Sequence, residues 1–156
     1  MKTMKEIRNI LNWYPFKPNS NILEIGADNF YLTELLLDKA KEVTSLVFLD
    51  SIKEEYSSNN NHKNLEVIST DYNKLIINKK YDYIILIDIN KYFKTMLPKS
   101  NNPFIEILNF CKQHLSEDGK ILLATDNRFG IKNFSGNQSD NEEYIFQNLE
   151  EKNENY

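Results

Sequence analysis

Carboxylates recur at one place in the pattern of this sequence, where each one follows or closes a short apolar run. These residues are Glu24, Asp50, Asp71, Asp88 and Asp126. The carboxyl ends of parallel strands meet at one edge of a sheet, so we expect these side chains to share a crevice there. Such carboxylates can accept hydrogen bonds from ribose hydroxyls or an adenine amino group, and they favour a cationic ligand. The alternative is that each acid only caps the helix or turn that follows it. Asp82 instead opens its apolar run, and we expect it to be structural.

Five strands have to position these acids, and β-branched or aliphatic runs predict where they are. The runs cover residues 21–26, 43–49, 65–69, 83–89 and 121–125. Amphipathic spacing predicts helices over residues 30–41 and 102–115, the second capped by Asn102 before a proline, and Gly119 is expected to break the chain after it. Continuous apolar strands that alternate with helices predict an α/β domain. We expect a Rossmann-like, doubly wound, mostly parallel sheet of about five strands, without a C-terminal strand hairpin.

The composition fits one such domain. The chain has 156 residues, of which 40% are hydrophobic and 27% charged, enough for a single sizeable core. No apolar run approaches the roughly 18 to 20 residues that cross a bilayer, and residues 1–8 lead into no secretory signal, so we expect no membrane span and a cytoplasmic location. Cys111 is the only cysteine, and the histidines form no cluster with it, so we expect no disulfide and no metal site.

The net charge of -4 is concentrated near the end of the sequence, because six acidic residues and one lysine follow residue 136. No basic patch typical of nucleic-acid binding is present. We therefore expect a folded domain over residues 1–136 and an acidic, partly ordered tail over residues 137–156. The fifth strand would leave an exposed sheet edge, which either Tyr144–Leu149 or a partner subunit in an oligomer could cover.

Several motifs resemble those of class I S-adenosylmethionine-dependent methyltransferases. They are residues 21–26 (NILEIG) with the helix behind them, the strand at Val43-Thr44, Asp71, residues 81–83 (YDY) and the region around Gly119. Residues 13–16 (WYPF) and 124–136 (ATDNRFGIKNFSG) are similar to methyltransferase-like regions of bacterial glycan and capsule biosynthesis proteins, which are often joined to glycosyltransferase domains. The resemblance implies a methyltransferase domain of surface polysaccharide biosynthesis that uses S-adenosylmethionine. It also implies a small-molecule or glycan acceptor and a glycosyltransferase domain or subunit as a partner.

The resemblance also implies which residues form the site. Those expected to bind the cofactor are Glu24, Gly26, Asp28, Asp50, Asp71, Tyr72 and Asp88, and those expected at the substrate are Asp126, Asn127 and Arg128. In the family, the positions of Glu24 and Gly26 lie at the methionine part of the cofactor, and that of Asp71 lies near the adenine. Arg128 could clamp a phosphate or carboxylate, or it could pair with a neighbouring acid and pin its loop. No catalytic residue is assigned, because methyl transfer from a sulfonium depends mainly on positioning the acceptor.

Three positions depart from the family pattern. Asp28 and Phe30 stand where the family has glycines, and Val47 stands where it has the acid that binds ribose, with Asp50 three residues later. A bulky residue such as Phe is disfavoured in the left-handed conformation that glycine adopts freely. Two functions therefore stay open: a methyltransferase whose turn takes another path, or a non-catalytic, methyltransferase-like scaffolding domain that has lost cofactor binding. A nicotinamide-dependent dehydrogenase is disfavoured, since its glycine fingerprint is even less complete here.

Overall fold

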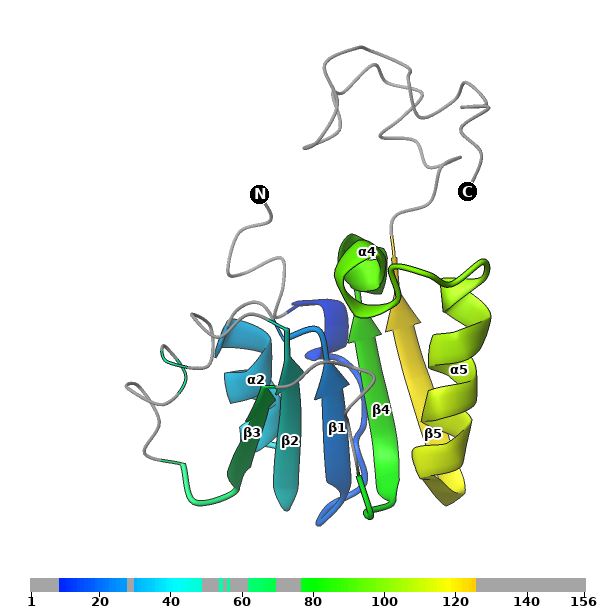
Figure 1. Ribbon diagram of the computed structural model, residues 1–156. Helices are drawn as coiled ribbons and strands as arrows, with labels where there is room; N and C mark the ends of the chain where they lie inside the picture. The colour runs from blue at the N-terminus through cyan, green and yellow to red at the C-terminus, as the bar shows by residue number, and fades with distance from the viewer. Residues whose placement is uncertain are drawn as a thin grey trace, which may run out of the picture. The chain divides into compact units, whose positions relative to one another are not determined.

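The computed structural model describes residues 9–27, 30–48, 54, 56, 62–69 and 77–125. These residues form a five-stranded sheet with strand order β3-β2-β1-β4-β5 (Figure 1). The strands are β1 (Asn21–Ile25), β2 (Glu42–Val47), β3 (Leu65–Ser69), β4 (Tyr81–Ile87) and β5 (Leu115–Ala124). Every neighbouring pair is parallel, so the predicted α/β fold with a Rossmann-like sheet is confirmed. The predicted division at residue 136 and the segment Tyr144–Leu149 lie outside the described residues.

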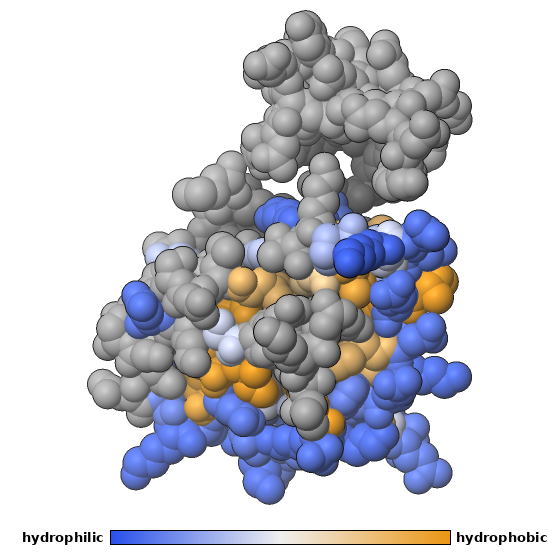
Figure 2. All heavy atoms as spheres, viewed as in Figure 1, coloured by the Kyte–Doolittle hydropathy of each residue, from blue (hydrophilic) through white to orange (hydrophobic). Residues whose placement is uncertain are grey.

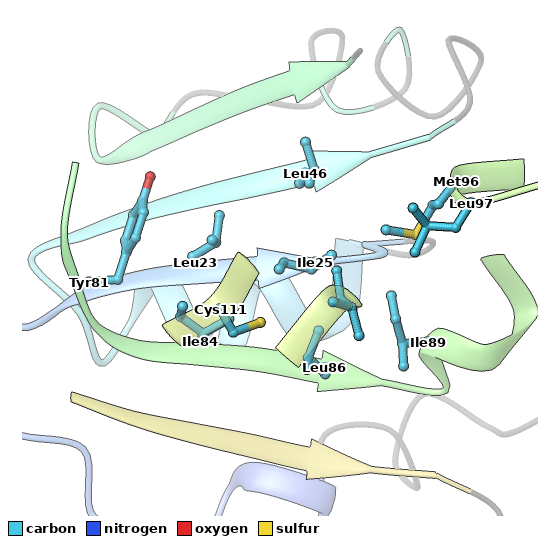
Figure 3. Close-up of a cluster of buried hydrophobic side chains, with 11 residues drawn as sticks. Leu23, Ile25, Leu46, Tyr81, Ile84, Leu86, Ile89, Met96, Leu97 and Cys111 are labelled. Atoms are coloured by element: carbon cyan, nitrogen blue, oxygen red, sulfur yellow. The ribbon is translucent and has the colours of Figure 1, made fainter. Parts of the chain in front are cut away.

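Helices cover both faces of the sheet. Helix α2 (Phe30–Leu37) connects β1 to β2, and its Leu36 packs with Ile22 of β1. Helix α5 (Pro103–His114) precedes β5, and its Ile107 and Cys111 pack with Leu23 in the cluster of Figure 3. Because successive side chains of a strand point to opposite faces, Ile22 and Leu23 place the two helices on opposite sides. No helix in the described parts of the chain is long and apolar enough to span a membrane.

The carboxyl ends of β1, β2 and β4 lie level with one another. Ile25 pairs with Leu46 of β2 on one side and with Leu86 of β4 on the other. The chain winds outward from β1 in one direction and from β4 in the other, so the switch point of the sheet lies between these two strands. Figure 2 shows hydrophilic side chains gathered along the lower border of the view. The strands of Figure 1 begin at this border, so it is the amino edge of the sheet, opposite to the carboxyl edge where the switch point lies.

Strand β5 begins six residues earlier than the sequence predicts, and Gly119 lies within it instead of breaking the chain. Tyr81 pairs with Leu115 but Tyr83 pairs with Lys120, so extra residues of β5 bulge out between these pairs. A Cβ atom at Gly119 would lie 2.9 Å from the carbonyl oxygen of Tyr81. The glycine therefore permits a close approach of two backbones, which is a common reason for glycine at a bulge.

Two other boundaries differ from the prediction. Helix α2 ends at Leu37, four residues early, and β4 runs from Tyr81 to Ile87 instead of over residues 83–89. The shift of β4 places Asp88 directly after the strand, where the chain turns into the 3-10 helix η2 (Ile89–Tyr92) and helix α4 (Phe93–Met96). The predicted helix start is confirmed, since the Asn102 side chain accepts a hydrogen bond from the backbone N–H of Ile105.

Asp82 ties three strands together at the amino edge of the sheet. Its Oδ2 accepts a hydrogen bond from the backbone N–H of Asn21 at 2.8 Å, and its Oδ1 accepts one from the Ser116 hydroxyl at 3.4 Å. These contacts join the start of β4 to the starts of β1 and β5. The structural role expected for Asp82 is confirmed.

Candidate functional site

Three of the predicted site residues are described, and the sheet brings them to one edge. Glu24 and Gly26 lie at the end of β1, and Asp88 lies at the end of the adjacent β4 (Figure 1). The other predicted residues lie outside the described ones and stay predictions: Asp28, Asp50, Asp71, Tyr72, Asp126, Asn127 and Arg128. The described part of the site is therefore the β1–β4 switch point itself.

Glu24 is buried between β1, β2 and α2, with only 3% of its surface exposed. Its Oε2 accepts hydrogen bonds from the Thr33 hydroxyl of α2 at 2.6 Å and from the Ser45 hydroxyl of β2 at 2.8 Å. The Thr33 hydroxyl also lies 2.8 Å from the Tyr56 hydroxyl. A carboxylate is costly to bury unless hydrogen bonds replace its water. The geometry thus gives Glu24 a positioning role, because it holds α2 and β2 against the end of β1.

Gly26 begins the turn that leaves β1, and two features of its surroundings require glycine. Its φ of +79° is a left-handed conformation, which side chains with a Cβ adopt only with strain. A Cβ atom at this position would also lie 3.0 Å from two carbon atoms of the Tyr92 ring and 3.3 Å from Cδ1 of Ile89. The Gly26 N–H donates to the carbonyl oxygen of Leu46 at 3.0 Å, which fixes the turn against β2.

Asp88 adopts a left-handed conformation as well, with φ 50° and ψ 35°, a region that Asp tolerates better than most residues. Its backbone N–H donates to the carbonyl oxygen of Ala124 at 2.8 Å, which joins the end of β4 to the end of β5. Asp88 is buried, with 8% of the residue's surface exposed, and its Oδ2 lies 3.5 Å from Nζ of Lys91. Lys91 thus supplies a cationic partner for this buried carboxylate.

Two aromatic residues at this edge were not identified from the sequence. Phe48 follows β2 and Tyr92 ends η2, and their ring centroids are 5.4 Å apart with a tilt of 45°. The Tyr92 ring lies against Gly26, as the short distances to a Cβ there demonstrate. No sequence motif marks Tyr92. The position of its ring depends on the left-handed turn at Asp88, whereas the sequence pattern predicts that the strand continues through this residue.

Phe30 and Val47, which depart from the family pattern, both pack on the α2 face of the sheet. Phe30 is the first residue of helix α2, and its ring meets the Tyr56 ring edge to face at 5.1 Å. Because the chain is already helical at Phe30, this residue does not occupy a left-handed turn. Val47 is fully buried against Ala27 and Tyr56, so the surroundings of this position offer an apolar contact instead of an acceptor for ribose hydroxyls.

Cys111 and His114 lie in the last turns of α5, which leads into the start of β5 and so lies away from this edge. The His62 ring, by contrast, lies 6.1 Å from the Phe30 ring. Burial raises the pKa of the Cys111 thiol to about 12, so the thiol stays protonated and unreactive at neutral pH. The ring nitrogens of His114 lie 2.8 Å from the carbonyl oxygen of Phe110 and 3.2 Å from that of Ile77. Among the residues that can be described, no three side chains of His, Cys, Asp or Glu gather as a metal site would require.

Comparison with known proteins yields solved structures alone, since no protein-family model and no curated protein matches the chain. An S-adenosylmethionine-dependent methyltransferase from Clostridium acetobutylicum matches 76% of this chain and 47% of its own, with 20% identity and a TM-score of 0.61. The N-methyltransferase NodS from Bradyrhizobium japonicum matches 75% of this chain and 64% of its own, with 17% identity and a TM-score of 0.61. Phosphoethanolamine N-methyltransferase 1 from Haemonchus contortus was solved with phosphoethanolamine and S-adenosylhomocysteine. It matches 74% of this chain and 24% of its own, with 26% identity and a TM-score of 0.60.

These likenesses establish the fold. The chain shares with these methyltransferases a Rossmann-like fold, in which a parallel sheet of order 3-2-1-4-5 has helices on both faces. It spans less than two thirds of the length of each of these three proteins. The names of these proteins make no connection to glycan or capsule synthesis.

Proposed function

We propose that the chain is an S-adenosylmethionine-dependent methyltransferase domain that binds its cofactor at the β1–β4 switch point. The observation that carries the proposal is the left-handed turn at Gly26, which sits at the carboxyl edge of a methyltransferase-like sheet. Ligands of open α/β sheets bind at this edge, outside the strand ends. Because Gly26 has no Cβ, a ligand could approach this backbone closely where the Tyr92 ring does not cover it.

Bound S-adenosylmethionine would supply a methyl group that its sulfonium sulfur already activates. The chain's own residues then have to bind and orient. Gly26 provides a backbone that can be approached closely, and Glu24 holds that backbone by its hydrogen bonds to Thr33 and Ser45. Asp88 lies at the same edge, where Nζ of Lys91 at 3.5 Å offsets the charge of its carboxylate. We assign Asp28, Asp50, Asp71 and Tyr72 to the cofactor, and Asp126, Asn127 and Arg128 to the acceptor, as the resemblance implies.

The finer parts of the proposal rest on sequence motifs. The segments 13–16 and 124–136 support a role in bacterial surface polysaccharide biosynthesis, with a small-molecule or glycan acceptor and a glycosyltransferase domain or subunit nearby. We also propose a cytoplasmic location, because no apolar run in the sequence approaches the roughly 18 to 20 residues that cross a bilayer.

A second function, a non-catalytic scaffolding domain, is favoured by one observation. Val47 is buried in an apolar cluster where the family has its ribose-binding acid. In this alternative the fold survives as an interaction module without the cofactor.

Thermal unfolding with S-adenosylhomocysteine separates the two functions. A ligand at a hundredfold excess over its dissociation constant stabilises the folded state by about 2.7 kcal/mol, which is roughly 5 to 10 °C for a chain of this size. We expect Asp71→Ala to reduce this shift and Asp82→Ala to lower the starting melting temperature but keep the shift. No shift at millimolar ligand for the wild-type chain would favour the scaffold.

A further inference from the structure

The Tyr92 ring covers the glycine on which the proposed site depends. Two of its carbon atoms lie 3.0 Å from the position of a Cβ atom on Gly26, so the ring edge packs directly on the glycine. Ile89 lies beside it at 3.3 Å from the same position. Ligands of such sheets bind at the switch point, where this turn lies. A ligand that approaches the Gly26 backbone from the side of the missing Cβ has to displace the Tyr92 ring.

The backbone that carries Tyr92 is anchored at both ends. At one end the backbone N–H of Asp88 donates a hydrogen bond to the carbonyl oxygen of Ala124, and Ile89 is fully buried. At the other end Met96 and Leu97 are buried in the core cluster, which also includes Ile89 (Figure 3). A swing of the whole segment would expose these apolar side chains to water, which is unfavourable. Rotation of the Tyr92 side chain between staggered positions is therefore the easier way to uncover Gly26.

The rotation has a measurable cost. In the closed position the Tyr92 ring contacts Phe48, with ring centroids 5.4 Å apart. Aromatic contacts of this type shift an equilibrium by roughly two- to tenfold. The contact is lost when the ring turns away, so the closed position dominates without a ligand.

We infer that Tyr92 controls access to the Gly26 turn, and that a nucleoside ligand binds only after its ring has turned aside. The inference rests on the proposed function, because it names the residue that restricts the proposed cofactor site. A site that is open only part of the time has an affinity reduced by the open fraction. Removal of the ring should therefore strengthen binding, in contrast to the loss expected when a binding contact is removed.

Isothermal titration with S-adenosylhomocysteine tests the inference on four chains: the wild type, Tyr92→Ala, Tyr92→Phe and Tyr31→Ala. We expect Tyr92→Ala to bind roughly two- to tenfold more tightly. Tyr92→Phe keeps the ring over Gly26 and should therefore bind less tightly than Tyr92→Ala. Tyr31 is 41% exposed on α2, so Tyr31→Ala is the matched control for loss of a tyrosine and should not change the affinity. If Tyr92→Ala does not melt as a folded protein, Tyr92→Leu replaces it, with the same direction expected.

A ligand-free measurement examines the closed position independently. Nuclear Overhauser effects between the Tyr92 ring and the Gly26 α-protons should be present without ligand and should disappear as ligand is added. Equal or weaker binding by Tyr92→Ala, or absence of these effects in the free chain, would overturn the inference and leave the proposed function standing. Failure of all the chains to bind, Tyr92→Ala included, would instead overturn the proposed function, and the access role would fall with it.

Discussion

At the scale of single residues, the buried carboxylate of Glu24 joins the end of β1 to β2 and α2. Glu24 was expected beside the cofactor, and the structure places its carboxylate among the hydroxyls of Thr33 and Ser45. An alternating strand pattern indicates which positions share a face, whereas hydrogen bonds between distant segments depend on how helix and strand pack. Tyr92 was missed for the same reason, since the left-handed turn at Asp88 aims it at Gly26.

Loss of the Glu24 carboxylate should destabilise the fold. Glu24→Ala leaves buried hydroxyls without their acceptor and opens a cavity, so we expect the free energy of unfolding to fall by about 2 to 4 kcal/mol. Urea denaturation measures this change. Glu117→Ala removes an exposed carboxylate from β5 and is the matched control, with an expected effect within about 0.5 kcal/mol. Equal effects of the two substitutions would refute the positioning role of Glu24.

At the scale of elements, the sequence pattern predicts the strands better than their ends. β3 has the predicted bounds, Leu65–Ser69, because polar segments flank a short β-branched run. β5 begins at Leu115 although polar residues and Gly119 interrupt its pattern. Pairing with the start of β4 and the Asp82–Ser116 hydrogen bond compensate for that weak local preference, and neither can be read from β5 alone.

The bulge in β5 yields a prediction of its own. Gly119→Ala would place a Cβ atom 2.9 Å from the carbonyl oxygen of Tyr81 and 2.8 Å from Cδ2 of Leu115. The strands have to move apart, so we expect a loss of about 1 to 3 kcal/mol in the free energy of unfolding. Lys120→Ala, at the neighbouring exposed position, is the control and should change little. A neutral result for Gly119→Ala would mean that the bulge tolerates a side chain.

At the scale of the whole molecule, the doubly wound architecture could be anticipated from two rules. Consecutive parallel strands lie near each other, and their crossovers are right-handed, which together favour a doubly wound sheet. The acceptor could not be predicted, because the residues that would recognise it follow β5 and carry no motif of one chemistry. The fold therefore constrains the cofactor more tightly than the substrate.

Stability of the whole molecule should decline in alkali. Burial raises the pKa of the Cys111 thiol from 9.0 to about 12, and burial also raises the pKa of the Tyr81 phenol. Above pH 9 the unfolded chain loses these protons before the folded chain does, so the free energy of unfolding falls as pH rises from 9 toward 12. The slope due to the thiol is at most about 1.4 kcal/mol per pH unit.

Urea denaturation at pH 7, at about pH 9 and at about pH 10.5 measures this slope, and Cys111→Ala should have a shallower one. An identical slope in that variant would argue against the buried thiol as its source.

Amide chemical shifts on titration with S-adenosylhomocysteine test the central claim most directly, because they locate the ligand on the sheet. The account predicts saturable shifts at the carboxyl edge, in Gly26, Ala27 and Asp88, while Asn21 and Asp82 at the amino edge stay in place. Shifts confined to the amino edge, or none at millimolar ligand, would contradict it.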